Sequence, residues 1–224
     1  MKNRPPAVAA IAFALLFVAA LLIVPPLPGF DASGEAVVAH LIQHSAAVRL
    51  QALLVALGSL ALVVVLGHAR TRLQGASAHV FTIGSAVVLA EFAVEMWFTA
   101  GLALNAHKLT PAAARVLADI ASMWGPLLTV ADVMVAVPIV LAANQHRFPR
   151  WLGILAAIFA LEQLIETVTI VGGAGFFAPG GIMNLYVGGP LFVVFFLALG
   201  LTSLSESAQS TSKNDSPSSG EPST

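Results

Sequence analysis

Six long apolar segments fill most of this 224-residue chain, and they restrict its fold more than any other feature. A helix needs about 20 predominantly apolar residues to cross the hydrocarbon core of a bilayer. Only 9% of the residues are charged, which is typical of a chain whose main solvent is lipid. The sequence therefore predicts an all-α bundle of six transmembrane helices. The predicted segments are 7–24, 50–67, 79–104, 119–143, 151–172 and 183–204.

Residues 1–204 are predicted to form one transmembrane domain, followed by a disordered cytoplasmic tail at 205–224. The tail consists almost entirely of small, polar and charged residues, so it cannot bury enough apolar surface to fold alone. The first segment, 7–24, is longer than the ~7–15 apolar residues of a signal peptide. Prolines follow it without a clear cleavage site, so we expect an uncleaved first helix.

The orientation follows from the basic residues that flank these segments, because cytoplasmic loops are enriched in Lys and Arg. One side receives seven basic residues: Lys2, Arg4, Arg70, Arg72, Arg147, Arg150 and Lys213. The other side receives three: Arg49, Lys108 and Arg115. Both termini are therefore predicted to lie in the cytoplasm, and the protein is predicted to be a multi-pass protein of the cell membrane.

The loops on the side opposite the termini carry local structural signals. Residues 34–49 have apolar residues at helical spacing, which predicts a short interfacial helix leading into the second segment. Thr110 and Pro111 form a helix start, with an N-cap followed by proline at the first helical position. Pro126 and Pro138 are expected to break or kink the fourth segment. The glycine-rich loop 172–181 is expected to be irregular.

Three stretches of the chain resemble a known group of proteins. They are the acidic loop, short helix and Ala-Arg-Thr-Arg-Leu exit within 34–73, the motif Phe148-Pro149-Arg150-Trp151-Leu152-Gly153, and the motif Phe177-Ala178-Pro179-Gly180-Gly181. Together they resemble the small six-span bacterial membrane proteins common in actinobacteria, which are related to a domain-of-unknown-function family. The resemblance extends to about Leu204. It implies a six-span fold in a bacterial membrane and contributes no site residues.

Five acidic residues lie inside the predicted segments, where an ionised carboxylate is costly. Glu91 and Glu95 are four residues apart, and Glu162 and Glu166 repeat this spacing, so each pair shares one face of its helix. Asp132 lies on a third segment. At about 1.5 Å per residue, Glu91, Glu162 and Asp132 lie at nearly one depth. We therefore expect the acids to meet near the middle of the membrane.

Two interpretations of these acids remain open from the sequence. Clustered carboxylates in a membrane mark ion pathways and proton relays, which suggests a cavity that binds a cation or a proton. Alternatively, the acids are structural: Arg49 would pair with Glu95 or Glu166, and polar side chains would hydrogen-bond the others. The polar candidates are Gln51, Thr99, Gln163, Thr167 and Thr169.

Enzymatic and metal-binding motifs are sparse. His40 and His44 lie one helical turn apart, a spacing that can hold a metal, with Asp31 and Glu35 as additional ligand candidates. A histidine pair on a wet interfacial helix is the simpler interpretation, so no metal and no other cofactor is predicted. No phosphate-binding glycine loop and no serine nucleophile elbow occurs, and these absences favour a protein that is not an enzyme.

Two functional hypotheses follow. The first is a small transporter or permease-like protein whose cavity is lined by the five acids. The alternative is a non-catalytic accessory or sensor protein that acts through a partner, since the chain is small for a secondary transporter. The lipid bilayer is the predicted partner, and a formal net charge of −1 gives no argument for nucleic acid. A protein partner or a homo-oligomer is left open.

Overall fold

The structure is a computed structural model that describes residues 4–172 and 175–214. These residues form helices and turns, with no strand among them. The α-helices are α1 (Arg4–Ile23), α2 (Gly34–Arg70), α3 (Gly75–Leu104), α4 (Pro111–Ser122), α5 (Trp124–Asn144), α6 (Arg150–Glu166) and α7 (Gly189–Asn214). Three short 3-10 helices, η1 (Ala106–Lys108), η2 (Thr167–Val171) and η3 (Gly175–Phe177), and a π-helical segment, η4 (Met183–Gly188), complete the fold.

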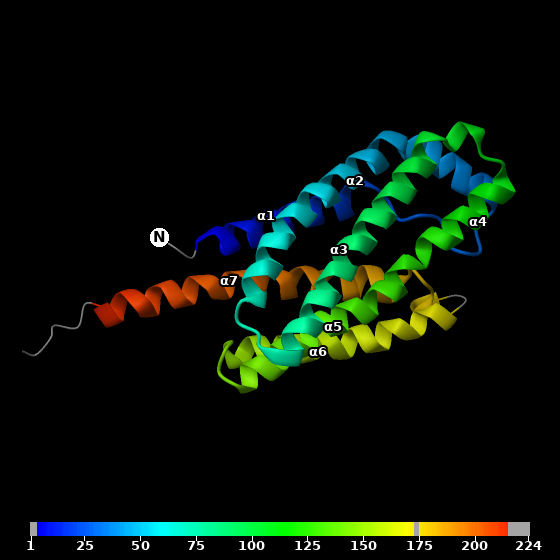
Figure 1. Ribbon diagram of the computed structural model, residues 1–224. Coiled ribbons are helices and arrows are strands. Elements are labelled where there is room, and N and C mark those ends of the chain that lie inside the picture. Colours follow the sequence, from blue (N-terminus) through cyan, green and yellow to red (C-terminus); the bar gives the residue numbers. More distant parts are fainter. Residues whose placement is uncertain (1–3, 173–174, 215–224) are drawn as a thin grey trace, which may run out of the picture.

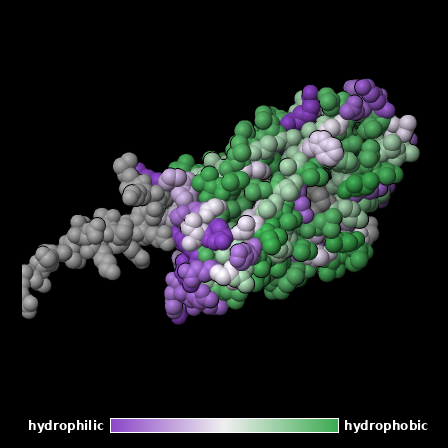
Figure 2. Space-filling model, viewed as in Figure 1, coloured by the Kyte–Doolittle hydropathy of each residue, from purple (hydrophilic) through white to green (hydrophobic). Residues whose placement is uncertain are grey.

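Six helical segments in the described part of the chain are long and apolar enough to cross a membrane. They confirm the predicted all-α bundle of six spans and make this a multi-pass membrane protein. Large apolar side chains on the surface of these helices face outward, among them Leu60, Ile83, Val94, Ile154 and Leu164. In Figure 2 hydrophobic residues cover the middle of the visible face, and hydrophilic residues gather at its two ends. This distribution suits contact with lipid.

The spans pack in a closed order. α1 packs against α2 and α7, α3 packs against α2 and α5, and α6 packs against α5 and, less extensively, α7. Successive spans run in opposite directions (Figure 1). We call the end that holds Arg4 and the connections 71–74 and 145–149 the terminal end. The distal end holds the connections 24–33 and 105–110, together with residues 172 and 175–182.

Several helix boundaries agree with the local signals. Thr110 caps α4, because its Oγ1 accepts a hydrogen bond of 3.3 Å from Ala113 N. The predicted break near Pro126 lies at Met123, between α4 and α5. Pro138 lies inside α5, and the predicted interfacial helix at 34–49 is continuous with the second span in the 37-residue helix α2.

Two segments differ from the sequence-based boundaries. The fifth span leaves regular α-helix at Glu166 and continues as η2, where Thr167 Oγ1 donates back to Gln163 O at 2.9 Å. At the other end of the sequence, α7 extends ten residues beyond the predicted boundary at 204, through Asn214. Ser, Glu, Ala, Gln and Lys in this stretch are compatible with a helix. Disorder of residues 215–224 stays a prediction, since they lie outside the described residues.

Candidate intramembrane acidic site

A cavity of about 280 Å³ lies within the bundle and is partly open. Side chains from all six spans contribute to its wall. At the distal end it reaches residues 25–30 of the loop after α1, together with Pro179 and Gly180 of the loop before α7. Its volume is near the lower limit of roughly 300–1,000 Å³ for small-molecule sites.

Three of the five predicted site residues line this cavity. Glu95 comes from α3, Asp132 from α5 and Glu166 from the end of α6. Glu91 and Glu162 do not line it, but with Glu166 they lie close enough to Asp132 to interact with it electrostatically. The structure thus brings together the acids from three spans, as expected from their similar depth.

The close packing of α3 on α5 contributes to this convergence. A methyl group built on Gly84 of α3 would lie 2.7 Å from Met134 Cβ and 2.9 Å from Ala131 O. A Cβ atom this close to its neighbours would clash with them, so only glycine fits at this position. Gly84 therefore lets α3 approach α5 beside Asp132.

Asp132 is the most deeply buried of the acids, with 1% of its surface exposed. Its Oδ1 has no hydrogen-bond partner. Glu91 Oε2, Glu95 Oε2 and Glu162 Oε1 are also buried without a partner. Buried polar atoms are nearly always hydrogen-bonded in folded proteins. Two of these four oxygens, on Asp132 and Glu95, belong to residues that line the cavity, so the cavity offers acceptors to a donor that enters it.

Two amide side chains donate to carboxylate oxygens of Glu162 and Glu166. Gln163 Nε2 donates to Glu162 Oε2 at 2.8 Å and to Glu166 Oε2 at 3.3 Å. Asn184 Nδ2, from η4, donates to Glu166 Oε1. Glu166 is therefore fixed from both sides, by its own helix and by the segment that precedes α7.

Of the five polar candidates for hydrogen bonds to the acids, Gln163 alone makes them. Gln51 Nε2 donates to Ala20 O at 3.0 Å, and Thr99 Oγ1 donates to the main chain of Glu95 at 2.9 Å. Thr167 Oγ1 lies 2.7 Å from Thr129 Oγ1, which joins η2 to α5. Thr169 Oγ1 is buried without a partner.

Three phenylalanines from three spans form the apolar part of the cavity wall. Phe17 of α1, Phe92 of α3 and Phe192 of α7 line the cavity. Their ring centroids are mutually 5.4–5.6 Å apart. Phe192 and Phe17 also contact Phe13, which continues the aromatic packing toward Phe196. The cavity is therefore closed by closely packed apolar rings on the side of the terminal end.

Arg49 is the predicted ion-pair partner of Glu95 or Glu166. Arg49 is exposed, and its Nε donates to Ser45 O at 3.4 Å within its own helix. No ion pair joins Arg49 to Glu95 or Glu166 among the side chains that the structure describes. Arg49 is instead an exposed side chain of α2 that bonds within its own helix, and its pairing with Glu95 or Glu166 stays a prediction.

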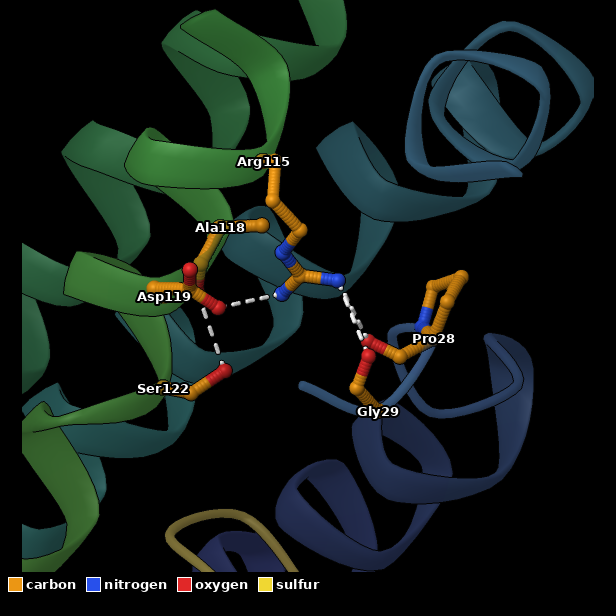
Figure 3. A network of polar contacts seen from close by, with 6 residues as sticks. All are labelled: Pro28, Gly29, Arg115, Ala118, Asp119 and Ser122. Atoms are coloured by element: carbon orange, nitrogen blue, oxygen red, sulfur yellow. Dashed lines mark hydrogen bonds and ion pairs between the residues drawn. The ribbon is translucent and has the colours of Figure 1, made fainter. Parts of the chain in front are cut away.

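A different arginine fixes the distal end of the cavity. Arg115 of α4 donates from Nη1 to Pro28 O at 3.3 Å and to Gly29 O at 2.9 Å. Its Nη2 lies 2.6 Å from Asp119 Oδ1, and its guanidinium lies 5.9 Å from the centroid of Phe30. Figure 3 shows this network, in which Arg115 joins the loop after α1 to α4. Because Pro28, Gly29 and Phe30 line the cavity, Arg115 holds one of its walls.

His40 and His44 lie together but apart from the acids. Their ring centroids are 4.7 Å apart. His40 contributes to the distal part of the cavity wall, and its Nε2 is buried without a partner. In the part of the chain that the structure describes, no group of three or more His, Asp or Glu is arranged to hold a metal ion.

Sequence reasoning missed the neighbours of Glu166 and the aromatic wall. Asn184 is a carboxamide at the start of an apolar segment, and this contrast was a usable signal. Gly188, whose main chain lies against the carboxyl of Glu166, and the three phenylalanines carried no such signal, because glycine and phenylalanine are ordinary residues in membrane helices.

Comparison with known proteins gives no further assignment. No family model, no curated protein and no solved structure matches this chain. The resemblance to small six-span bacterial membrane proteins therefore stays a prediction.

Proposed function

We propose that this protein is a small transporter or permease-like protein that binds a cationic solute or a proton in its acidic cavity. The observation that carries the proposal is Asp132, a carboxyl that is 1% exposed, lines the cavity and has an oxygen without a partner. An isolated buried charge is expensive, so its presence in a cavity is best explained by a ligand that compensates it.

The arrangement of the cavity supports a role in transport. The cavity reaches loop residues at the distal end and is closed by phenylalanines toward the terminal end. A site that is accessible from one side is one of the two states needed for alternating access. With both termini in the cytoplasm of a bacterium, the distal end would face outward.

Irregular helices lie beside the site, as they do in many transporters. The α4–α5 break, η2 and η4 all lie next to cavity residues. Asn184 is in the π-helical segment and binds Glu166. Such segments change conformation at lower cost than a continuous α-helix, because their hydrogen bonds are already non-standard.

Cysteine accessibility tests the cavity without knowledge of the solute. Because the chain contains no cysteine, a single introduced cysteine is the only site that a thiol reagent can modify. Leu185→Cys lines the cavity, whereas Leu164→Cys is an exposed apolar position on the outside of α6. We expect a cationic methanethiosulfonate to modify Leu185→Cys faster than an anionic one, from the distal side. Adding Asp132→Asn should reduce this charge preference. Equal rates for the two reagents would overturn the proposal of a cation-attracting cavity.

Charge movement then separates transport from the alternative of a sensor or accessory protein. Proteoliposomes on a solid-supported membrane would be exposed to Na⁺, K⁺ or tetramethylammonium. A transporter gives a current whose decay slows when the liposomes contain less protein, and Asp132→Asn should abolish it. A signal whose decay does not depend on protein density reports binding alone and would favour the sensor or accessory protein.

A further inference from the structure

We propose that the ligand of this cavity is a small organic ammonium ion that carries an apolar body. This inference rests on the proposed function and specifies its ligand class. The cationic head would lie at Asp132, Glu95 and Glu166, and the body would lie against Phe17, Phe92 and Phe192.

The acidic part of the cavity is complementary to an N–H donor. Asp132 Oδ1 and Glu95 Oε2 are buried acceptors without partners. Ammonium groups carry several N–H donors and no acceptor. Hydrogen bonds between an ammonium and a carboxylate are charge-assisted and therefore stronger than neutral ones. An ammonium head at Asp132 Oδ1 would satisfy that oxygen near Glu166, and Glu95 Oε2 is a further acceptor on a residue that lines the same cavity.

The aromatic part of the cavity is complementary to an apolar body. Phe17, Phe92 and Phe192 are 7%, 2% and 4% exposed, and all three line the cavity. Ring faces attract cations and pack against apolar groups. A bare metal ion would leave this wall without a contact, whereas an aromatic or alkyl ammonium would use both the rings and the acids.

The two parts come largely from different helices, although α3 contributes to both with Glu95 and Phe92. Asp132 and Glu166 belong to α5 and α6, while Phe17 and Phe192 belong to α1 and α7. α6 and α7 pack together less extensively than α1 and α7 do. A ligand with a polar head and an apolar body would therefore connect the two sides of the bundle.

Calorimetric titration of the purified protein in detergent tests the inference. The probe is 2-phenylethylammonium chloride, and the neutral control of similar shape is 2-phenylethanol. Methylammonium tests the head alone, and Na⁺ and Ca²⁺ test inorganic cations. We expect 2-phenylethylammonium to bind at least tenfold more tightly than either the alcohol or methylammonium, because each lacks one of the two contacts.

Variants assign the two parts of the site. Asp132→Asn should weaken 2-phenylethylammonium binding by about tenfold or more. Glu95→Gln is a second test of the acidic part, should Asp132→Asn reduce folding. Phe192→Ala should weaken the aromatic probe roughly threefold or more while leaving methylammonium unchanged. Phe195→Ala, which removes a buried ring that does not line the cavity, should leave both affinities unchanged.

The outcomes separate this inference from the proposed function. Tight binding of Na⁺ or Ca²⁺ through Asp132, with no binding of 2-phenylethylammonium, would overturn the ligand class and leave a cation-binding cavity. Equal affinity for the ammonium and the alcohol would show an apolar pocket and overturn the inference. If no cation binds and the two methanethiosulfonates react alike, both proposals are wrong.

Discussion

The main chain of Gly188 lies directly against the carboxyl group of Glu166. A methyl group built on Gly188 would overlap Glu166 Oε2, and it would lie 3.0 Å from Glu166 Cδ and 3.4 Å from Glu162 Oε1. The glycine therefore provides the space that the carboxyl occupies. Since protein interiors are closely packed, the two positions cannot both be enlarged.

Replacing Gly188 by alanine should displace Glu166 and weaken the bundle. We expect a loss of about 1–3 kcal/mol of unfolding free energy, as for other overpacked sites, together with weaker cation binding. Gly189→Ala is the matched control, because its methyl group would lie 3.5 Å from Asn184 O and 4.0 Å from Leu21 Cδ1, which are ordinary contacts. Denaturation in detergent measures both variants. Equal stability of the two would contradict the close packing of Gly188 on Glu166.

The two arginines at the distal end should differ in their contribution to stability. Arg49→Gln should change the unfolding free energy by no more than about 0.5 kcal/mol, as expected for an exposed side chain. Arg115→Gln should cost about 1–3 kcal/mol, because it removes the charge-assisted hydrogen bonds to Pro28 O and Gly29 O. Amide hydrogen exchange in residues 25–30 should rise in Arg115→Gln alone. A large loss in Arg49→Gln would restore the ion-pair interpretation.

Binding of a cation should release a proton. Gln163 Nε2 donates to an oxygen of both Glu162 and Glu166, so the two carboxyl groups lie close together, and repulsion between two like charges favours one proton held by the pair. A positive ligand at Glu166 disfavours that proton by electrostatic repulsion. Adding 2-phenylethylammonium to the protein in weak buffer near pH 7 should therefore acidify the solution.

Two variants complete this measurement: Glu166→Gln in the cavity and a control variant at an exposed position outside it. The amide cannot lose a proton, so Glu166→Gln should bind without acidification or with a smaller release. Glu35→Gln, at the exposed start of α2, should behave like the unchanged protein. Equal proton release by Glu166→Gln would show that the proton comes from another group.

The membrane orientation can be tested with single cysteines. Ala112→Cys lies at the distal end and Gln145→Cys at the terminal end, and both positions are exposed. In intact cells, a membrane-impermeant maleimide should label Ala112→Cys and leave Gln145→Cys unlabelled until the membrane is opened. The reverse pattern would invert the predicted topology, in which both termini face the cytoplasm.

The positions of the spans and of the acids were predictable because both depend on local sequence. Length and hydropathy determine which segments can cross a bilayer, and these properties located all six spans. A constant rise per residue places Glu91, Asp132 and Glu162 at similar depth. Convergence of the acids follows if their helices pack together, as α3, α5 and α6 do.

The partners of the acids were harder to predict, because they depend on how each helix is rotated. From its position at the end of the predicted second segment, Arg49 was expected to reach Glu95. In the structure its side chain is exposed and donates to Ser45 O of its own helix. Asn184 donates to Glu166 from η4, a π-helical segment whose i→i+5 hydrogen bonds differ from those of an α-helix. Hydropathy patterns carry no information on either rotation.

The layer of phenylalanines between the cavity and the terminal end also determines where a membrane voltage acts. Packed apolar rings have a low dielectric constant and admit no ions, so a voltage falls across them. A water-filled cavity, in contrast, has nearly the potential of the solution to which it opens. A transmembrane voltage would therefore fall mainly across Phe17, Phe92 and Phe192 rather than across the cavity. Moving one elementary charge through that layer changes the energy by about 2.3 kcal/mol per 100 mV. Loading of the site would then be nearly independent of voltage, and release past the rings would carry the electrical work.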